Sequence, residues 1–389
     1  MTGLRLKLPA ADGTLTEHRL SGAEPIDPPP DPPRGRVAIA AAHVVANALA
    51  PADPAVVASI DWDATLAWRR YLWGSGLGVA EAMDTAQRGM GLDWPSSLTL
   101  IQRAVAEANA VGGQIVCGAG TDQVTPDTTV DLDAVIAAYA EQFEAVEAAG
   151  GRIVMMASRA LTRCATGPED YHRVYGELLR QAREPVILHW LGEVFDPALA
   201  GYWGAPDLAT AADVVVDVIT DNADAVDGVK VSVLDADVEV GLRRRLPQGV
   251  RCYTGDDFNF PDLIAGDAQG HSDALLGIFD AIAPVAATAF AALDADDMAR
   301  YSDLLGPTVA LSRHIFAAPT YHYKTGLVFL AWLNGHQDHF RMIAGQESAR
   351  SVVHLAKLLV LADQARLLRD PELAASRMRT LLALSGVPS

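Results

Sequence analysis

Short apolar runs alternate with amphipathic segments along most of the chain. The runs occupy residues 37–45, 77–83, 113–119, 151–158, 185–191, 228–234, 250–256 and 274–280. Their length and composition predict eight β-strands. The segments between them, such as 97–113 and 132–151, repeat apolar residues every three or four positions and end in glycine, as amphipathic helices do. This alternation predicts a (β/α)8 barrel.

The two ends of the chain depart from this alternation. Residues 4–20 alternate around an Asp-Gly turn and predict a small hairpin. The proline-rich residues 25–36 predict an extended linker. From about residue 285 onward, the pattern predicts additional helices. We therefore expect a hairpin and linker over residues 1–36, a barrel over 37–300 and a helical region over 301–389.

One predicted strand carries a lysine among valines. Val229, Val231 and Val233 alternate with Lys230 and Ser232. The valines suit the helix-facing side of a parallel barrel strand, so Lys230 and Ser232 would point inward. Burial disfavours an ammonium group and can yield a neutral amine, the nucleophile that forms a Schiff base with a carbonyl. The spacing alone equally allows a lysine paired with an interior aspartate.

Composition and charge narrow the class of protein and of partner. Half of the 389 residues are apolar, yet no window of about 18 residues is uninterruptedly apolar, so we expect a globular protein without a membrane span. A formal net charge of −19 disfavours nucleic acid and anionic membranes as partners. Cys117, Cys164 and Cys252 lack metal-site or disulfide spacing, and no apolar leader follows Met1, which predicts a cytoplasmic protein.

Two motifs resemble a known enzyme family. Gly-Val-Lys-Val-Ser at 228–232, followed by Tyr-Thr-Gly-Asp-Asp at 253–257, resembles the dihydrodipicolinate synthase and N-acetylneuraminate lyase family of class I aldolases. The resemblance extends over roughly residues 36–340 and implies that Lys230 is the Schiff-base lysine. Residues 81–87 resemble the loop after the second strand of the family, with Thr85 and Gln87 at its threonine and glutamate positions. Residues 318–335 resemble its C-terminal lysine-containing helix.

The departures from the family pattern are also informative. The family has a proton-shuttling tyrosine on the fourth strand, whereas this chain has Met-Met-Ala-Ser-Arg-Ala-Leu at 155–161, with Arg159 near the tyrosine position. The family's carboxylate-binding Gly-Thr-Thr-Gly loop is reduced to residues 83–86. These differences argue against a pyruvate-specific synthase and indicate a divergent branch of unknown function.

Polar residues at the ends of predicted strands could assist the lysine, because barrel enzymes place their chemistry there. His189 could move a proton during imine chemistry, or could be a core histidine. Arg159 could bind a carboxylate or phosphate, or could form a surface salt bridge. Asp84 and Thr85 could bind substrate hydroxyls, or could cap a helix.

Other residues complete the candidate set. Ser232, Gly255, Asp256 and Asp257 are expected at the substrate, although the two aspartates could instead cap the helix that starts near Pro261. His43 and Asp280, at the ends of the first and eighth predicted strands, are further candidates. Together with His189 and Asp84, they could also converge on a divalent metal.

We therefore expect a Schiff-base-forming lyase, an aldolase or dehydratase, that acts on a sugar-derived or keto-acid carbonyl compound. Lys230 and His189 are its expected catalytic residues. No metal or cofactor is expected, since nucleotide-binding motifs are missing and an imine can itself withdraw electrons. The resemblance implies a homo-oligomer. A metal-dependent barrel lyase or hydrolase and a non-catalytic ligand-binding relative are the alternatives.

Overall fold

The computed structural model describes residues 4–51 and 58–388. Its chain forms two compact units, which we call the barrel unit (36–42 and 78–277) and the helical unit (1–35, 43–77 and 278–389). The two units interleave along the chain, whereas the sequence predicts three consecutive segments. Residues 1–3 of the predicted N-terminal segment lie outside the described residues.

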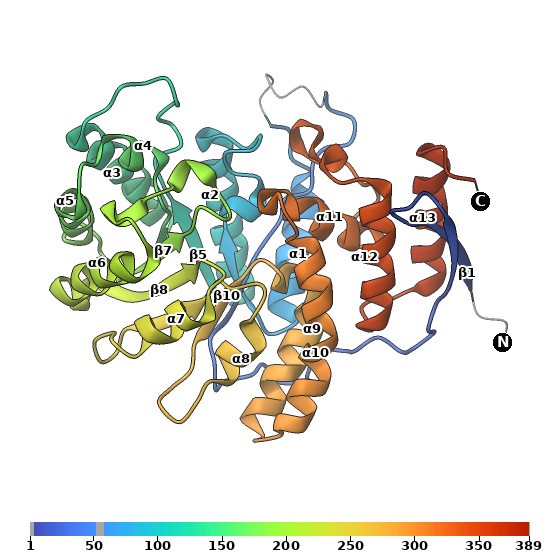
Figure 1. Ribbon diagram of the computed structural model, residues 1–389. Coiled ribbons are helices and arrows are strands. Elements are labelled where there is room, and N and C mark those ends of the chain that lie inside the picture. The colour runs from blue at the N-terminus through green and yellow to red at the C-terminus, as the bar shows by residue number, and fades with distance from the viewer. Residues whose placement is uncertain (1–3, 52–57, 389) are drawn as a thin grey trace. The chain divides into compact units, whose positions relative to one another are not determined.

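Eight parallel strands close into a barrel in the barrel unit (Figure 1). They are β3 (Ala38–Ala41), β4 (Gly78–Glu81), β5 (Ile115–Ala119), β6 (Arg152–Met155), β7 (Val186–Leu191), β8 (Val226–Ser232), β9 (Arg251–Thr254) and β10 (Asp273–Leu276). Each strand pairs with the next, and β10 closes the barrel by pairing with β3. Every predicted apolar run overlaps one strand, so the predicted (β/α)8 barrel is confirmed.

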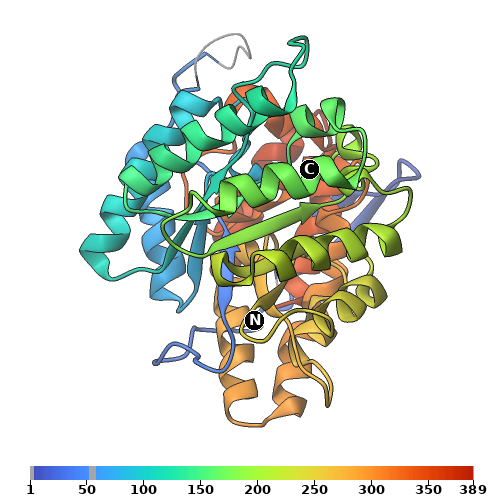
Figure 2. The same cartoon turned by 90° about the vertical axis from the view of Figure 1, so that its left-hand side faces the viewer.

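Helices follow the strands in chain order and lie over the green strands of Figure 2. Those of the barrel unit are α2 (Trp94–Val111), α3 (Leu132–Ala148), α4 (Arg159–Cys164), α5 (Pro168–Leu179), α6 (Leu208–Asp221), α7 (Ala236–Arg243) and α8 (Phe260–Ala265). Asp93 and Asp131 cap α2 and α3 by accepting hydrogen bonds from backbone N–H groups. Gly112 ends α2 in the left-handed conformation that glycine adopts easily.

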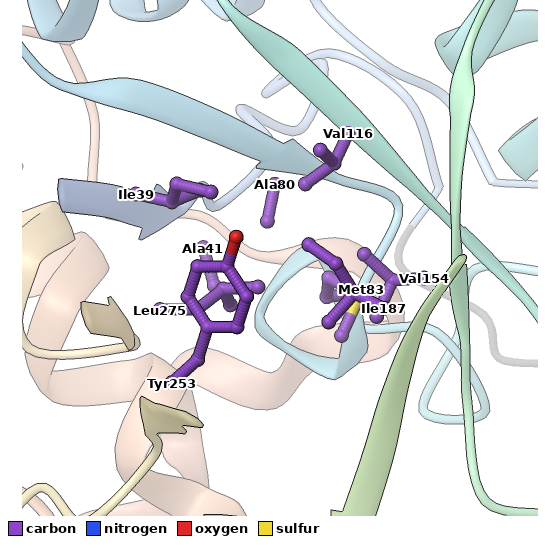
Figure 3. Packing of buried hydrophobic residues seen from close by; sticks show 9 residues of the cluster. All are labelled: Ile39, Ala41, Ala80, Met83, Val116, Val154, Ile187, Tyr253 and Leu275. Atoms are coloured by element: carbon purple, nitrogen blue, oxygen red, sulfur yellow. The ribbon is translucent and has the colours of Figure 1, made fainter. Parts of the chain in front are cut away.

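The interior of the barrel is filled by side chains that alternate inward along the strands. Figure 3 shows Ile39, Ala41, Ala80, Met83, Val116, Val154, Ile187, Tyr253 and Leu275 pointing toward one another. Gly228 makes room for the large ring of Tyr253, because a Cβ at Gly228 would lie 2.7 Å from its Cε2 atom. The barrel interior is therefore a packed core rather than an open channel.

The helical unit contains the predicted hairpin and the predicted C-terminal helices. Its elements are β1 (Arg5–Pro9), β2 (Leu15–Arg19), α1 (Trp62–Gly74), α9 (Phe279–Asp294), α10 (Met298–Ile315), α11 (Tyr323–Leu333), α12 (Val352–Gln364) and α13 (Pro371–Leu384). Strands β1 and β2 pair antiparallel, with Arg5 opposite Arg19. The side chain of His18 and the backbone of Ser21 bond to Asp363 on α12, which ties the hairpin to the helices.

The predicted strand over 274–280 is too long. Strand β10 ends at Leu276 and α9 begins at Phe279, so Asp280 lies in the first turn of a helix. The intervening apolar residues fit a buried strand and a buried helix equally well, which is why periodicity does not separate them. Similarly, β3 ends at Ala41, two residues before His43. Among the described residues, no helix is both long and apolar enough to cross a bilayer.

Candidate active site

Lys230 lies on the inner side of strand β8. Its Cα pairs with His189 on β7 and with Tyr253 on β9, and paired residues of a parallel sheet face the same side. Tyr253 belongs to the interior cluster, so Lys230 and His189 also point inward. Lys230 is only 6% exposed, and it is the only lysine between residues 36 and 277.

The surroundings of Lys230 favour a neutral amine. Burial lowers the pKa of its amine below the usual lysine value, although the negative charges of Asp84 and Asp257 oppose this shift. The net direction is downward, so a larger fraction of the amine is unprotonated near neutrality than in an exposed lysine. Two carboxylates, contributed by the loops after β4 and β9, thus act on the same amine.

His189 is fully buried beside Lys230. Its Nε2 atom lies 3.2 Å from the hydroxyl oxygen of Ser232. Its Nδ1 atom is buried and makes no hydrogen bond to any described residue. Burial, together with the positive charge of Lys230, holds the pKa of His189 well below its usual value. The imidazole is therefore neutral at physiological pH and can accept a proton.

Gly255, which follows β9, lets the side chains of Lys230 and Ser232 on β8 approach its backbone closely. A Cβ at this position would lie 2.1 Å from Ser232 Oγ and 2.9 Å from Lys230 Cε. Ser232 ends β8 and is itself buried. The structure thus brings Lys230, His189, Ser232 and Gly255 together, and their roles in a reaction stay predictions.

The loop after β4 carries two further candidates. Asp84 and Thr85 lie in the short helix η1 (Asp84–Ala86), where Asp84 is half-buried and Thr85 is buried. Ala82 and Gln87 flank this turn with φ values of 51° and 63°. Left-handed backbone at non-glycine residues is costly and is concentrated at functional sites. This backbone conformation supports the loop as part of the candidate site.

The two aspartates after β9 differ in what they contact. The carboxylate of Asp256 accepts hydrogen bonds from the backbone N–H groups of Phe258 and Asn259, at 2.8 and 3.0 Å, and from the Asn259 side chain at 2.8 Å. It caps the turn before α8, which is the alternative that the sequence left open. Asp257 is buried and its charge acts on Lys230. Of this pair, we retain only Asp257 as a candidate site residue.

Arg159 is the first residue of α4 and is half exposed at its side chain. Its Nε atom donates to the Asp196 carboxylate at 2.5 Å. This is the surface salt bridge that the sequence offered as an alternative to substrate binding. A Cβ at Gly89 would lie 4.0 Å from Arg159 Nη1, so the guanidinium borders the loop that follows β4.

Sequence reasoning did not identify Arg88. Its guanidinium is buried and makes five hydrogen bonds: to both oxygens of Asp122, to the carbonyl oxygens of Ala82 and Gly118, and to the side chain of Gln142. Because an arginine has five N–H donors, all of them are used. Through these bonds, Arg88 holds the loop that follows β4 against β5 and α3. No local sequence motif identifies Arg88, because its side-chain partners lie far from it along the chain.

A cluster of phenols occupies the end of β6, where the resemblance places a single tyrosine. The backbone N–H of Ser158 donates to the hydroxyl of Tyr202 at 3.1 Å. The Tyr175 and Tyr202 hydroxyls are 2.9 Å apart, and the Tyr139 hydroxyl donates to the Met156 carbonyl at 2.5 Å. Burial raises the pKa of all three phenols. Tyr202 comes from the loop after β7, so a comparison of the fourth strand with that of the family does not identify it.

Glu239 on α7 is a second buried titratable group that the sequence did not single out. It is fully buried, and one of its oxygens accepts a hydrogen bond from Ser272 Oγ at 2.6 Å. Burial raises the pKa of its carboxyl group to about 8. This carboxyl group lies on the helix-bearing side of the barrel wall, because α7 packs against β9.

His43 and Asp280 meet within the helical unit. His43 Nδ1 lies 2.6 Å from Asp280 Oδ2, and Trp68 Nε1 donates to Asp280 Oδ1 at 2.6 Å. His43 Nε2 lies 3.2 Å from Gln337 Oε1. The imidazole of His43 and the carboxylate of Asp280 thus both belong to a buried hydrogen-bond network. Within residues 4–51 and 58–388, no three His, Cys, Asp or Glu side chains gather as a metal-binding group.

The barrel unit also has a cavity of about 220 Å³, lined by Trp190, Leu208, Ala211 and Val233 among others. Trp190 and Val233 alternate with the inward residues His189 and Ser232, so they face the opposite side of the wall. The cavity therefore lies between the strands and α6, separate from the Lys230 side chain.

Comparisons with known proteins agree with the fold. The model of a family described as protein of unknown function, DUF993, matches residues 6–387. No curated protein matches the chain. The chain is similar to the structure of YagE, a prophage protein from E. coli K12 of the dihydrodipicolinic acid synthase family, in complex with pyruvate. The identity is 12% and the TM-score 0.66, and the alignment covers 86% of this chain and 99% of YagE.

Two more solved structures show the same likeness. A putative dihydrodipicolinate synthetase from Pseudomonas aeruginosa is 14% identical with a TM-score of 0.64, covering 85% of this chain and 100% of that chain. Dihydrodipicolinate synthase from Aquifex aeolicus is 13% identical with a TM-score of 0.62, covering 86% and 99%. The predicted resemblance is confirmed, and at these identities it is a likeness of fold.

Proposed function

We propose that this chain, which belongs to the DUF993 family of proteins of unknown function, is a class I aldolase-like lyase whose Lys230 forms a Schiff base with a carbonyl substrate. The observation that carries the proposal is the burial of this single lysine on the inner side of the sixth barrel strand, beside a neutral histidine. Lysines with a lowered pKa in such sites are suited to nucleophilic catalysis.

The proposed reaction begins with attack of the neutral amine on the carbonyl carbon. The carbinolamine that forms loses its hydroxyl group as water, and the C=N bond of a protonated imine remains. The imine then accepts the electron pair of a C–H or C–C bond at the neighbouring carbon, which yields an enamine and releases either a proton or, with loss of a hydroxyl proton, a carbonyl fragment. In a dehydration, the enamine expels a hydroxyl group from the next carbon, which leaves as water. After a cleavage, the enamine takes up a proton on carbon and becomes an imine again. Hydrolysis of the imine restores the amine and releases the carbonyl product.

His189 is the proposed proton carrier. Its neutral imidazole lies on the strand next to Lys230, and its Nδ1 atom is unpaired among the described residues. A neutral imidazole can take the proton that the attacking amine loses and return it to the departing hydroxyl group. Tyr253 is unsuited to this role, because its hydroxyl group donates to Asp227 at 2.6 Å near the start of β8.

The likeness to solved structures supports the choice of reaction class. YagE is described as belonging to the dihydrodipicolinic acid synthase family and was solved with pyruvate, and the structure from Pseudomonas aeruginosa is described as a putative dihydrodipicolinate synthetase. The position of Lys230 on the sixth barrel strand matches the lysine position that the sequence motifs imply. A homo-oligomeric state and a cytoplasmic location remain part of this proposal.

Borohydride trapping tests the proposal. The protein is incubated with a panel of carbonyl compounds, reduced with borohydride and digested, and its peptides are analysed by mass spectrometry. We expect a stable secondary amine on Lys230 with at least one compound, and none at this site in Lys230→Arg. Lys7 and Lys357, which are exposed in the helical unit, serve as internal controls for nonspecific reaction. Modification that is no faster at Lys230 than at these two lysines would refute the proposal.

A further inference from the structure

We propose that the cavity of about 220 Å³ beside α6 is a second binding site, which takes a small organic cation with an apolar body. The proposal does not depend on the chemistry of Lys230, because the cavity lies on the helix-facing side of β7 and β8. It follows from the size of the cavity, from the side chains that form its buried part and from the charges at its opening.

The buried part of the cavity, which we call the floor, is formed by apolar and aromatic side chains. Its residues are at most 8% exposed and are Trp190, Leu199, Tyr202, Ala211 and Val233. An apolar cavity of roughly 150 Å³ is large enough to bind benzene. A volume of about 220 Å³ therefore accommodates a molecule somewhat larger than a benzene ring, and it suits a small molecule better than a protein segment.

The cavity is preformed, because the loop after β7, which contributes most of its lining, is held in place. Trp203 and Gly204 have φ values of 72° and 69°, so the backbone turns sharply there. The hydroxyl group of Tyr202 accepts a hydrogen bond from the Ser158 N–H at 3.1 Å and lies 2.9 Å from the Tyr175 hydroxyl oxygen. The ring of Tyr202 cannot swing into the cavity without breaking these buried hydrogen bonds, which is costly.

Trp190 contributes an unused hydrogen-bond donor to the floor. Its side chain is only 2% exposed, and its indole N–H donates to no acceptor within residues 4–51 and 58–388. The indole nitrogen is not completely enclosed by protein atoms, so it borders the cavity that this side chain lines. An oxygen atom of a ligand can accept this hydrogen bond, which a hydrocarbon would leave unmade.

The exposed part of the lining, which we call the rim, carries only negative charge. It consists of Glu193, Val194, Pro206, Asp207 and Leu208, together with Gly201. None of the described lining residues is a lysine, an arginine or a histidine. Neither carboxylate of the rim forms an ion pair with a described residue. The rim therefore attracts cations and repels anions.

Asp207 stays ionised at neutral pH because of its position before α6. Its carboxylate accepts hydrogen bonds from the Thr210 backbone N–H at 2.9 Å and from the Thr210 hydroxyl group at 3.1 Å. These bonds, led by the one from the backbone, hold the pKa of Asp207 below its usual value. The negative charge at the opening of the cavity is thus present throughout the physiological pH range.

An organic cation matches the floor and the rim together. Its apolar groups cover the floor, where the aromatic rings of Trp190 and Tyr202 also attract positive charge. Its charge is attracted by the rim carboxylates, an interaction that solvent weakens without abolishing it. An inorganic cation would leave the apolar floor uncovered, and a carboxylate or phosphate ligand would meet like charges.

Choline tests the proposal, because it combines a quaternary ammonium group with a hydroxyl oxygen that can accept the indole N–H. Its isostere 3,3-dimethylbutan-1-ol has the same shape without the charge, and 3,3-dimethylbutanoate carries a negative charge. Binding of each compound to the full chain is measured by saturation-transfer NMR titration in about 0.15 M salt, which screens long-range attraction to the acidic protein. We expect choline to bind at least about tenfold more tightly than the alcohol and the carboxylate not to bind.

Two valine substitutions show where choline binds. Val194→Arg places a positive charge on the rim, so we expect the affinity for choline to fall at least about tenfold. Val111→Arg is the matched control, because Val111 ends α2 outside the cavity lining and makes the same change in net charge. Val111 and Val194 are 50% and 42% exposed, so neither substitution disturbs the packed core. Val111→Arg should keep the wild-type affinity.

The measurements decide the proposal in either direction. Tighter binding of choline than of the alcohol, lost in Val194→Arg and kept in Val111→Arg, would support it. Equal affinities for choline and the alcohol would overturn it, because the ligand would not be selected by charge. An equal loss of affinity in the two variants would also overturn it, because choline would then be held by the overall charge of the protein. Failure of choline, tetramethylammonium and benzyltrimethylammonium to bind would show that the cavity is no site for organic cations.

Discussion

Gly255→Ala perturbs the candidate site by one methyl group. The added Cβ would lie 2.1 Å from Ser232 Oγ, 2.8 Å from the carbonyl oxygen of Val231 and 2.9 Å from Lys230 Cε. The Ser232 hydroxyl can rotate away. The Val231 carbonyl cannot, because it accepts the hydrogen bond of the Gly255 N–H at 2.8 Å. The ends of β8 and β9 must therefore separate.

Overpacking of this kind costs about 1–3 kcal/mol of folding free energy. Gly255 has no positive φ, so the cost comes from the steric clash alone. We expect a lower midpoint of thermal unfolding and, in the protein that remains folded, slower borohydride trapping at Lys230, because its side chain is displaced.

Gly241→Ala is the matched control for this change. Gly241 lies within α7, and a Cβ there would meet no atom within 4 Å. Alanine is favoured over glycine in a helix by roughly 0.5–1 kcal/mol, so this variant should be as stable as the wild type or more stable. The reasoning fails if Gly255→Ala has wild-type stability and also a wild-type trapping rate.

Four other measurements follow from the structure. The trapping rate at Lys230 should rise with pH and reach its plateau at a lower pH than that of Nα-acetyllysine, because the pKa of Lys230 is lowered; coincident profiles would contradict this. His189→Ala should lower kcat on a trapped substrate by about a hundredfold or more, with a smaller change in KM; near-normal kcat would remove His189 from the mechanism. The pKa of Glu239 is raised to about 8 in the folded protein. Between the unfolded-state pKa and pH 8, the folded state therefore binds more protons than the unfolded state, so the free energy of unfolding falls as pH rises toward 8. Glu239→Gln should lessen this fall, which urea unfolding at pH 5 and pH 8 can check. Activity should survive EDTA, whereas loss with EDTA and recovery with a divalent metal would favour the metal-dependent alternative.

The architecture was predictable because each strand of the barrel is an apolar run bounded by amphipathic helices. The inward direction of Lys230 was predictable for the same reason, since a strand alternates its side chains with a period of two. The sequence could not decide what Asp256 and Arg159 contact. A carboxylate can cap a helix as well as bind a substrate, and a guanidinium can form a surface salt bridge as well as bind a substrate. Arg88 and Tyr202 act through tertiary contacts that no local spacing encodes.

The burial that lowers the pKa of Lys230 exists only after β7, β8 and β9 have paired and the loops carrying Asp84 and Asp257 are in place. In an unfolded chain, Lys230 has the reactivity of any exposed lysine. Its excess reactivity over the exposed Lys357 in reductive amination therefore reports closure of the barrel. Pulse labelling during refolding would time the formation of the site directly, and it would do so without any knowledge of the natural substrate.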